Sequence, residues 1–171
     1  MDSLSSRDAL QPLIGLPLSR IGRASSLLWM HFGKLSEIAL SDGRTKTVGD
    51  WAVHVQCSWR LARKGAIVLA SRDFYRTNDG QLIGGDWENS GESKFDRMVK
   101  TINQAPPWII RSIDCDNIGG FKLNIGGEFN FDVFPDSSAP GELWRLLQPS
   151  TPHKHFVVKS NRDGQVLGIF E

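Results

Sequence analysis

Residues Trp51–Leu61 read W-A-V-H-V-Q-C-S-W-R-L, and their large apolar side chains fall at every second position. Because successive side chains of a β-strand point to opposite faces, this period of two predicts one long strand. Its apolar face holds Trp51, Val53, Val55, Cys57, Trp59 and Leu61. Its other face carries His54, Gln56, Ser58 and Arg60 in one row. One face therefore belongs to the core, and the polar row is either a solvent-exposed surface or the lining of a binding site.

Short apolar or alternating runs recur on both sides of this stretch. Those at 26–32, 66–71, 108–113, 121–125 and 128–134 are bounded by turn-forming residues and predict further strands. Gly126 and Gly127, between the last two runs, predict a two-residue hairpin. Residues 76–92 contain four glycines among polar residues and predict the longest loop.

One helix is predicted from local signals at Ser93–Gln104. Ser93 can cap it with Asp96 three residues on, and an apolar stripe at helical spacing follows. Residues Ser3–Leu18 leave room for a short N-terminal helix, limited by Pro12 and Pro17. The sum is an α+β fold, mostly antiparallel β: a curved meander sheet of about nine to ten short strands, with one covering helix at 93–104. We expect residues 1–171 to form a single globular domain.

Composition narrows the function classes. Lys plus Arg is 20 and Asp plus Glu is 19, so the net charge of +1 argues against general binding of nucleic acid. No apolar run approaches the roughly 20 residues that span a bilayer, and the polar start Met1–Asp8 lacks a secretory pattern. We therefore expect a cytoplasmic protein without a membrane partner. Cys57 and Cys115 are expected to be reduced, with Cys57 a buried thiol.

Chemical motifs give no enzyme assignment. His153 and His155 could share a metal, but no third ligand is evident, and the D-C-D-N run at Asp114–Asn117 lacks the spacing of a calcium loop. Phosphate loops and nucleophile elbows are absent. We therefore predict no metal and no cofactor, and whether the protein is an enzyme stays open, with a non-enzymatic role favoured.

The polar row offers binding chemistry. Arg60, beside Gln56 and Ser58, could hold a carboxylate or phosphate with its fork of donors. Arg72 and Asp73 follow the next strand, and a hairpin would bring them near Arg60, where Arg60 and Asp73 could simply pair as surface charges.

Three blocks resemble a known kind of protein. They are H-V-Q-C-x-W-R at His54–Arg60, A-S-R-D-F-Y at Ala70–Tyr75, and F-x-V-F-P-D-S-S-x-x-x-E-x-W-R-L at Phe131–Leu146. Together they resemble small, uncharacterised bacterial proteins of the domain-of-unknown-function kind, over residues 14–158. The third block is also similar to small bacterial immunity and accessory domains. This resemblance implies an accessory role and supplies no catalytic residue.

Three hypotheses follow. The first is a non-enzymatic protein-interaction module of accessory or immunity-like type, with Arg60 and Trp87 as anchors of its contact face, since interfaces favour Arg and Trp. The second is a small-ligand binding domain with a pocket that contains both His54 and Arg60. The third is an enzyme whose site gathers His31, His54, Arg60 and Asp73; a strongly shifted pKa of His54 would favour it.

Overall fold

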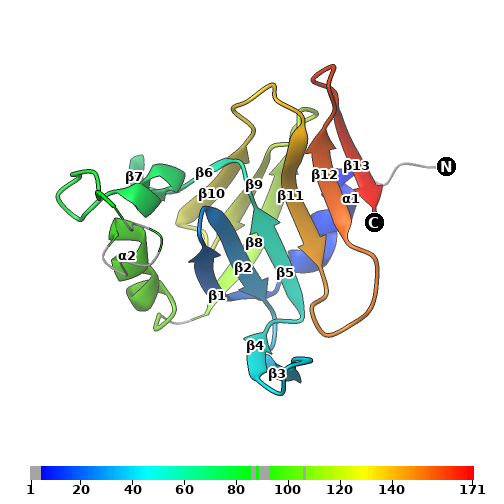
Figure 1. Cartoon of the computed structure of the whole chain (residues 1–171), viewed down its shortest axis with the longest axis horizontal. Helices are drawn as coiled ribbons and strands as arrows, with labels where there is room; N and C mark the ends of the chain where they lie inside the picture. The colour runs from blue at the N-terminus through cyan, green and yellow to red at the C-terminus, as the bar shows by residue number, and fades with distance from the viewer. Residues whose placement is uncertain (1–4, 86–87, 89–92, 106) are drawn as a thin grey trace.

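The computed structural model describes residues 5–85, 88, 93–105 and 107–171, and its regular secondary structure is mostly antiparallel β, as predicted (Figure 1). The strands are β1 (Pro17–Ala24), β2 (Leu27–Phe32), β3 (Ser36–Ala39), β4 (Thr45–Val48), β5 (Trp51–Val55), β6 (Ser58–Arg63), β7 (Ala66–Ala70), β8 (Trp108–Cys115), β9 (Phe121–Ile125), β10 (Phe129–Phe134), β11 (Gly141–Leu147), β12 (Phe156–Ser160) and β13 (Val166–Phe170). The α-helices are α1 (Ser6–Leu10) and α2 (Lys94–Ile102), and the 3-10 turns are η1 (Gln11–Leu13) and η2 (Ser71–Tyr75). No helix among the described residues is long and apolar enough to cross a membrane.

The strands are more numerous than predicted, and they do not form a meander. Eleven of them make one open sheet in the order β13-β12-β11-β5-β2-β1-β8-β9-β10-β6-β7, and β3 pairs with β4 as a separate hairpin. The expected sheet of about nine to ten strands was therefore wrong in number and order. Neighbours such as β5 and β11 come from distant parts of the chain, and sequence runs do not reveal that pairing.

The sheet bends so that its two halves face each other. Only Gln56 and Cys57 separate β5 from β6, although β5 is fourth and β6 tenth in the strand order. We call β13, β12, β11, β5, β2 and β1 the first half, and β8, β9, β10, β6 and β7 the second half. The ring centroids of Phe121 in β9 and Trp144 in β11 lie 5.0 Å apart, so side chains of both halves meet in one core.

The predicted strand Trp51–Leu61 is broken at its centre. Gln56 and Cys57 both donate their backbone N–H groups to the carbonyl of Leu143, at 2.9 and 3.3 Å. This ends β5 and turns the chain from the first half of the sheet into the second. The predicted core face is confirmed at Val53, Val55, Trp59 and Leu61, which are buried, whereas Trp51 and Cys57 are half-buried.

The helices and turns predicted from local sequence signals were mostly confirmed. Helix α2 begins after Ser93, whose Oγ accepts the N–H of Asp96 at 3.0 Å, as predicted. Gly126 and Gly127 have φ of +61° and +80° between β9 and β10, which glycine adopts without strain. The N-terminal helix is present, but it is confined to α1 and η1, and Pro17–Ala24 forms a strand that we did not predict.

Candidate functional site

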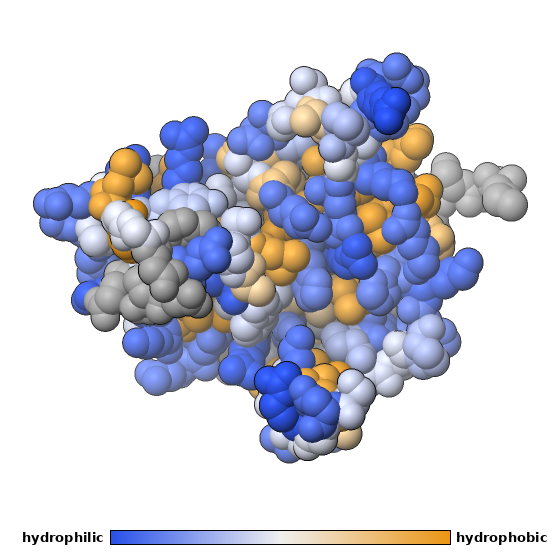
Figure 2. Space-filling view, viewed as in Figure 1, coloured by the Kyte–Doolittle hydropathy of each residue, from blue (hydrophilic) through white to orange (hydrophobic). Residues whose placement is uncertain are grey.

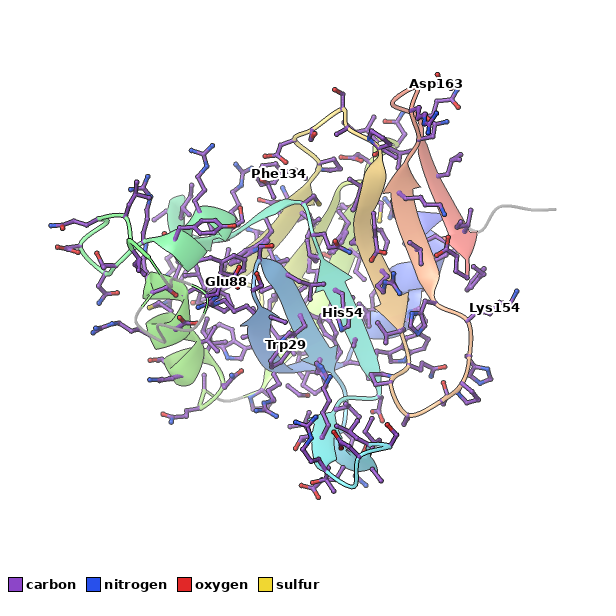
Figure 3. All side chains as sticks on the ribbon, viewed as in Figure 1. Trp29, His54, Glu88, Phe134, Lys154 and Asp163 are labelled. Atoms are coloured by element: carbon purple, nitrogen blue, oxygen red, sulfur yellow. The ribbon has the colours of Figure 1, made fainter. Side chains whose placement is uncertain are left out.

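The predicted polar row does not form one surface. His54 lies in β5 on the outer side of the first half, whereas Ser58 and Arg60 lie in β6 of the second half. Figure 3 shows the separation: His54 is beside Trp29, and Phe134, the ring that Arg60 covers at 5.2 Å, lies apart from them. Gln56 is exposed at the break between the strands.

The residues around Arg60 are held in surface pairs. Arg60 donates through Nε to Asp132 at 3.0 Å, and Lys122 shares that carboxylate at 3.4 Å. Ser58 donates to Asp136 at 2.6 Å. These pairs satisfy the polar groups of β6 locally.

The possible pairing of Arg60 with Asp73 is not formed, although β6 and β7 do make the predicted hairpin. The carboxylate of Asp73 accepts the N–H of Ala70 at 2.8 Å and lies 3.6 Å from Lys94, and Arg72 is exposed. Asp73 is therefore a local cap for η2. Trp87, the other predicted anchor, lies outside the described residues.

A second set of residues surrounds His54 instead. Strand register places Trp29 on one side of it and Arg145 on the other. Arg145 donates through Nε to Glu142 at 2.7 Å, and its Nη1 lies 3.1 Å from Nδ1 of His155. The ring of His54 itself forms no hydrogen bond with any described residue, so both nitrogens stay available.

Trp29 lies across the neighbouring strand because that strand has a glycine there. A Cβ on Gly22 would stand only 2.1 Å from the Trp29 ring, so the indole occupies the space that any side chain in β1 would need. Arg20 covers the same indole at 5.8 Å, within the range of a cation–π contact. We call Arg20, Trp29, Lys46, His54 and Arg145 the His54 face.

Positive charge dominates this face. The pKa of His54 is lowered to about 4, first by burial and then by the charges of Lys46 and Arg145, and Glu142 offsets these only in part. Arg20 and Lys46 are exposed, and neither forms an ion pair with a described residue. His54 is therefore neutral at physiological pH, on a surface with unpaired cations.

His31, next to Trp29 at 5.2 Å between ring centroids, is a buried structural residue. Its Nδ1 accepts the backbone N–H of Gly49 at 2.8 Å, which fixes the neutral tautomer with the proton on Nε2. Burial, followed by the charge of Lys46, lowers its pKa to about 4. A proton on Nδ1 would break the bond to Gly49.

The protein should therefore lose stability in acid through His31. The unfolded chain has the higher pKa, near 6.5, so it takes up the proton first; stability is full above pH 6.5 and falls as the pH drops through 4. The expected loss from this residue is about 3 kcal/mol, since each pKa unit corresponds to about 1.4 kcal/mol. The pKa of His54 is lowered in the same way, so we expect His31→Asn, which keeps an acceptor for Gly49, to reduce the pH dependence of urea unfolding between pH 7 and 4 without abolishing it. The exposed His153→Asn should leave it unchanged, and equal slopes in wild type and His31→Asn would contradict this assignment.

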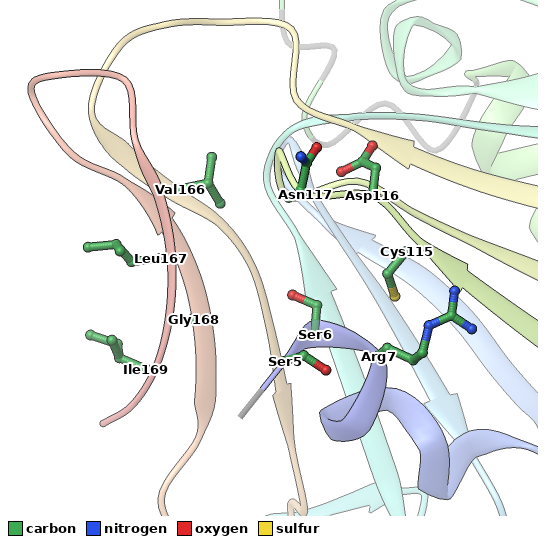
Figure 4. A pocket seen from close by; sticks show the side chains of 11 residues that line it. Ser5, Ser6, Arg7, Cys115, Asp116, Asn117, Val166, Leu167, Gly168 and Ile169 are labelled. Atoms are coloured by element: carbon green, nitrogen blue, oxygen red, sulfur yellow. The ribbon is translucent and has the colours of Figure 1, made fainter. Parts of the chain in front are cut away.

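None of the described cavities is lined by both His54 and Arg60. Arg60 lines an open hollow of about 340 Å³, and His54 lines none of the described cavities. The largest of these cavities, about 590 Å³, lies elsewhere, between α1, the residues that follow β8, and β13 (Figure 4). The pocket required by the second hypothesis is therefore not formed by these residues.

The cysteine thiols are poor nucleophiles. Both cysteines are free, and burial raises the pKa of Cys57 to about 12. Burial also raises the pKa of Cys115, which lines the largest of the described cavities beside Arg7 (Figure 4). Reactive thiols have lowered pKa values, so neither site favours thiolate chemistry. Among the described residues, no cluster of three or more His, Cys, Asp or Glu could hold a metal ion.

Comparisons with protein-family models, with curated proteins and with solved structures found no match to this chain. The resemblance carried by the three sequence blocks thus remains an expectation. Of the described residues predicted for a site, only His54 belongs to the His54 face; Gln56, two residues on, bonds Glu142 through its side chain. Sequence reasoning missed Trp29 and Arg145, because only the strand order places them beside His54, and it missed Lys46, which acts on His54 through its charge from the separate β3-β4 hairpin.

Proposed function

We propose that the protein is a non-enzymatic protein-interaction module that uses the His54 face to bind an acidic surface of a partner protein. The observation that carries the proposal is the pairing of unsatisfied cations with an aromatic anchor: Arg20 and Lys46 have no carboxylate partner among the described residues, and Arg20 covers Trp29. Tryptophan and arginine are the residues that most often dominate binding energy at interfaces.

The shape of the face supports a protein partner rather than a small molecule. It lines none of the described cavities, and it spans four adjacent strands, β11, β5, β2 and β1, with Lys46 added from the separate hairpin strand β4. In the space-filling view this side of the molecule is largely hydrophilic, with apolar groups between (Figure 2). Such a mixture is typical of non-obligate interfaces.

Electrostatics supports an acidic partner. Cations that lack partners in the free protein gain them on binding, and complementary charge also speeds association. A carboxylate docked near His54 would oppose the charges of Lys46 and Arg145, so the pKa of His54 should rise in the complex.

The enzyme hypothesis is weaker, although one observation favours it. The pKa of His54 is strongly shifted, as that hypothesis expects. However, burial and nearby cations account for the shift, and no carboxylate among the described residues is hydrogen-bonded to the ring. Asp73 and Arg60, which the hypothesis needs beside His54, are bound to residues elsewhere.

A titration followed by NMR tests the proposed face. We expect a decapeptide of glutamate to shift the Trp29 indole N–H signal and the His54 ring signals in a saturable way, and to raise the pKa of His54. A decapeptide of lysine is the control and should leave these signals in place. Shifts confined to other tryptophans and histidines, or none at all, would contradict the proposal.

A further inference from the structure

A separate cavity lies under α2, on the side of the molecule away from β13 (Figure 1). Its volume is about 270 Å³. The floor consists of the buried side chains Leu61, Ile125 and Phe129, and the roof of Met98 and Ile102 from α2. None of these residues belongs to the His54 face.

The helix above the cavity is fixed at both ends. At its start, Arg23 in β1 donates from Nε and Nη2 to the two oxygens of Asp96, both at 2.8 Å. Just beyond its end, the side-chain amide of Asn103 accepts the N–H of Ile21 at 2.9 Å and donates to the carbonyl of Ile21 at 3.0 Å. Because α2 is held to β1 at both ends, it cannot move inward to close the space beneath it. The cavity is therefore a stable part of the fold.

The lining specifies the chemistry of a ligand. Trp108 and Phe129 form an aromatic wall, with ring centroids 4.3 Å apart and planes at 77°. The polar side chains are the exposed Thr101 and the half-exposed Arg63, which mark the mouth. Glu128 lies 2.6 Å from Arg63 and offsets its charge, so the mouth favours neither anions nor cations.

The size and the wall point to one class of ligand. An apolar cavity of roughly 150 Å³ holds a benzene molecule, so this larger one suits a two-ring molecule. We propose that the cavity under α2 binds an uncharged bicyclic aromatic molecule.

Titration with 2-naphthol tests this site directly. We expect saturable binding by calorimetry and a shift of the Trp108 indole N–H signal. Val68, which lines the cavity from β7, can be enlarged to fill it: Val68→Phe should weaken binding at least tenfold. The control is its neighbour Ile67, which is 60 % exposed and does not line the cavity. Ile67→Phe adds a ring to the same strand outside the cavity, so the affinity of this variant for 2-naphthol should equal that of wild type.

The alternatives are distinguishable. If Val68→Phe fails to unfold cooperatively, Ala105→Leu fills the cavity from the other side and is expected to give the same loss. An absence of saturable binding to wild type, or equal affinity of wild type and the filled variants, would overturn the proposal. Tighter binding of 2-naphthoate than of 2-naphthol would overturn its claim of an uncharged ligand.

Discussion

Replacing Trp59 with alanine is expected to lower the free energy of unfolding by about 3–5 kcal/mol, the range for truncating a fully buried aromatic side chain. Trp59 stacks on Phe131 at 5.5 Å between ring centroids, and it meets Phe74 of η2 and Phe95 of α2 at 5.6 and 5.8 Å. It therefore joins β6 to both elements that cover the second half of the sheet. Urea denaturation of the variant measures the loss.

The matched control is Trp51→Ala. Trp51 belongs to the same predicted strand and is the same residue type, but it is only half-buried. Its truncation removes less buried surface, so the loss should be clearly smaller. Equal losses in the two variants would contradict the placement of Trp59 at the centre of the aromatic cluster.

The second large effect is expected for Asp96→Ala, at about 3 kcal/mol or more, because removing one partner of a buried ion pair deprives the other charge of its main hydrogen-bonding carboxylate. The side chains of Arg23 and Asp96 are only 7% and 17% exposed, and two hydrogen bonds join them. The variant should also loosen α2 from β1, which hydrogen exchange of the α2 amides would detect.

An exposed pair provides the control for this prediction. Lys159 and Glu171 form an ion pair whose side chains are 40% and 46% exposed. Exposed pairs contribute about 0–1 kcal/mol, so Glu171→Ala should change the free energy of unfolding very little. If Asp96→Ala changed the free energy of unfolding as little as Glu171→Ala, the ion pair between Asp96 and Arg23 would not anchor the helix.

The parts of the fold that local chemistry dictates could be predicted. Ser93 and Asp96 mark the start of α2, and the alternation in Trp51–Leu61 correctly identifies Val53, Val55, Trp59 and Leu61 as buried. The break at Gln56 could not be predicted, since it depends on the carbonyl of Leu143, which comes from a strand far along the chain. Strand β1 was missed because Pro17–Ala24 has polar residues and a glycine where a strand pattern would have apolar ones.

The contacts of the candidate site also depend on strand order, which local sequence does not reveal. The row from His54 to Arg60 follows from period two, but its partners follow from strand order. Asp132 binds Arg60 because β10 pairs with β6, and Arg145 lies beside His54 because β11 pairs with β5. Neither pairing leaves a local mark in the sequence. The possible contact between Arg60 and Asp73 rested on a hairpin that does form, between β6 and β7, but Arg60 bonds Asp132 of β10 instead.

The measurement that tests the central claim most directly is affinity capture from lysate of the source cells, with wild type compared with Arg20→Glu/Lys46→Glu. The control is Lys100→Glu/Arg111→Glu, which makes the same charge change at exposed residues outside the His54 face. We predict a stoichiometric acidic protein that binds wild type and the control, is released by salt, and is lost from the Arg20/Lys46 variant. Capture of no such protein by wild type, or equal capture by all three, would contradict the role of the His54 face.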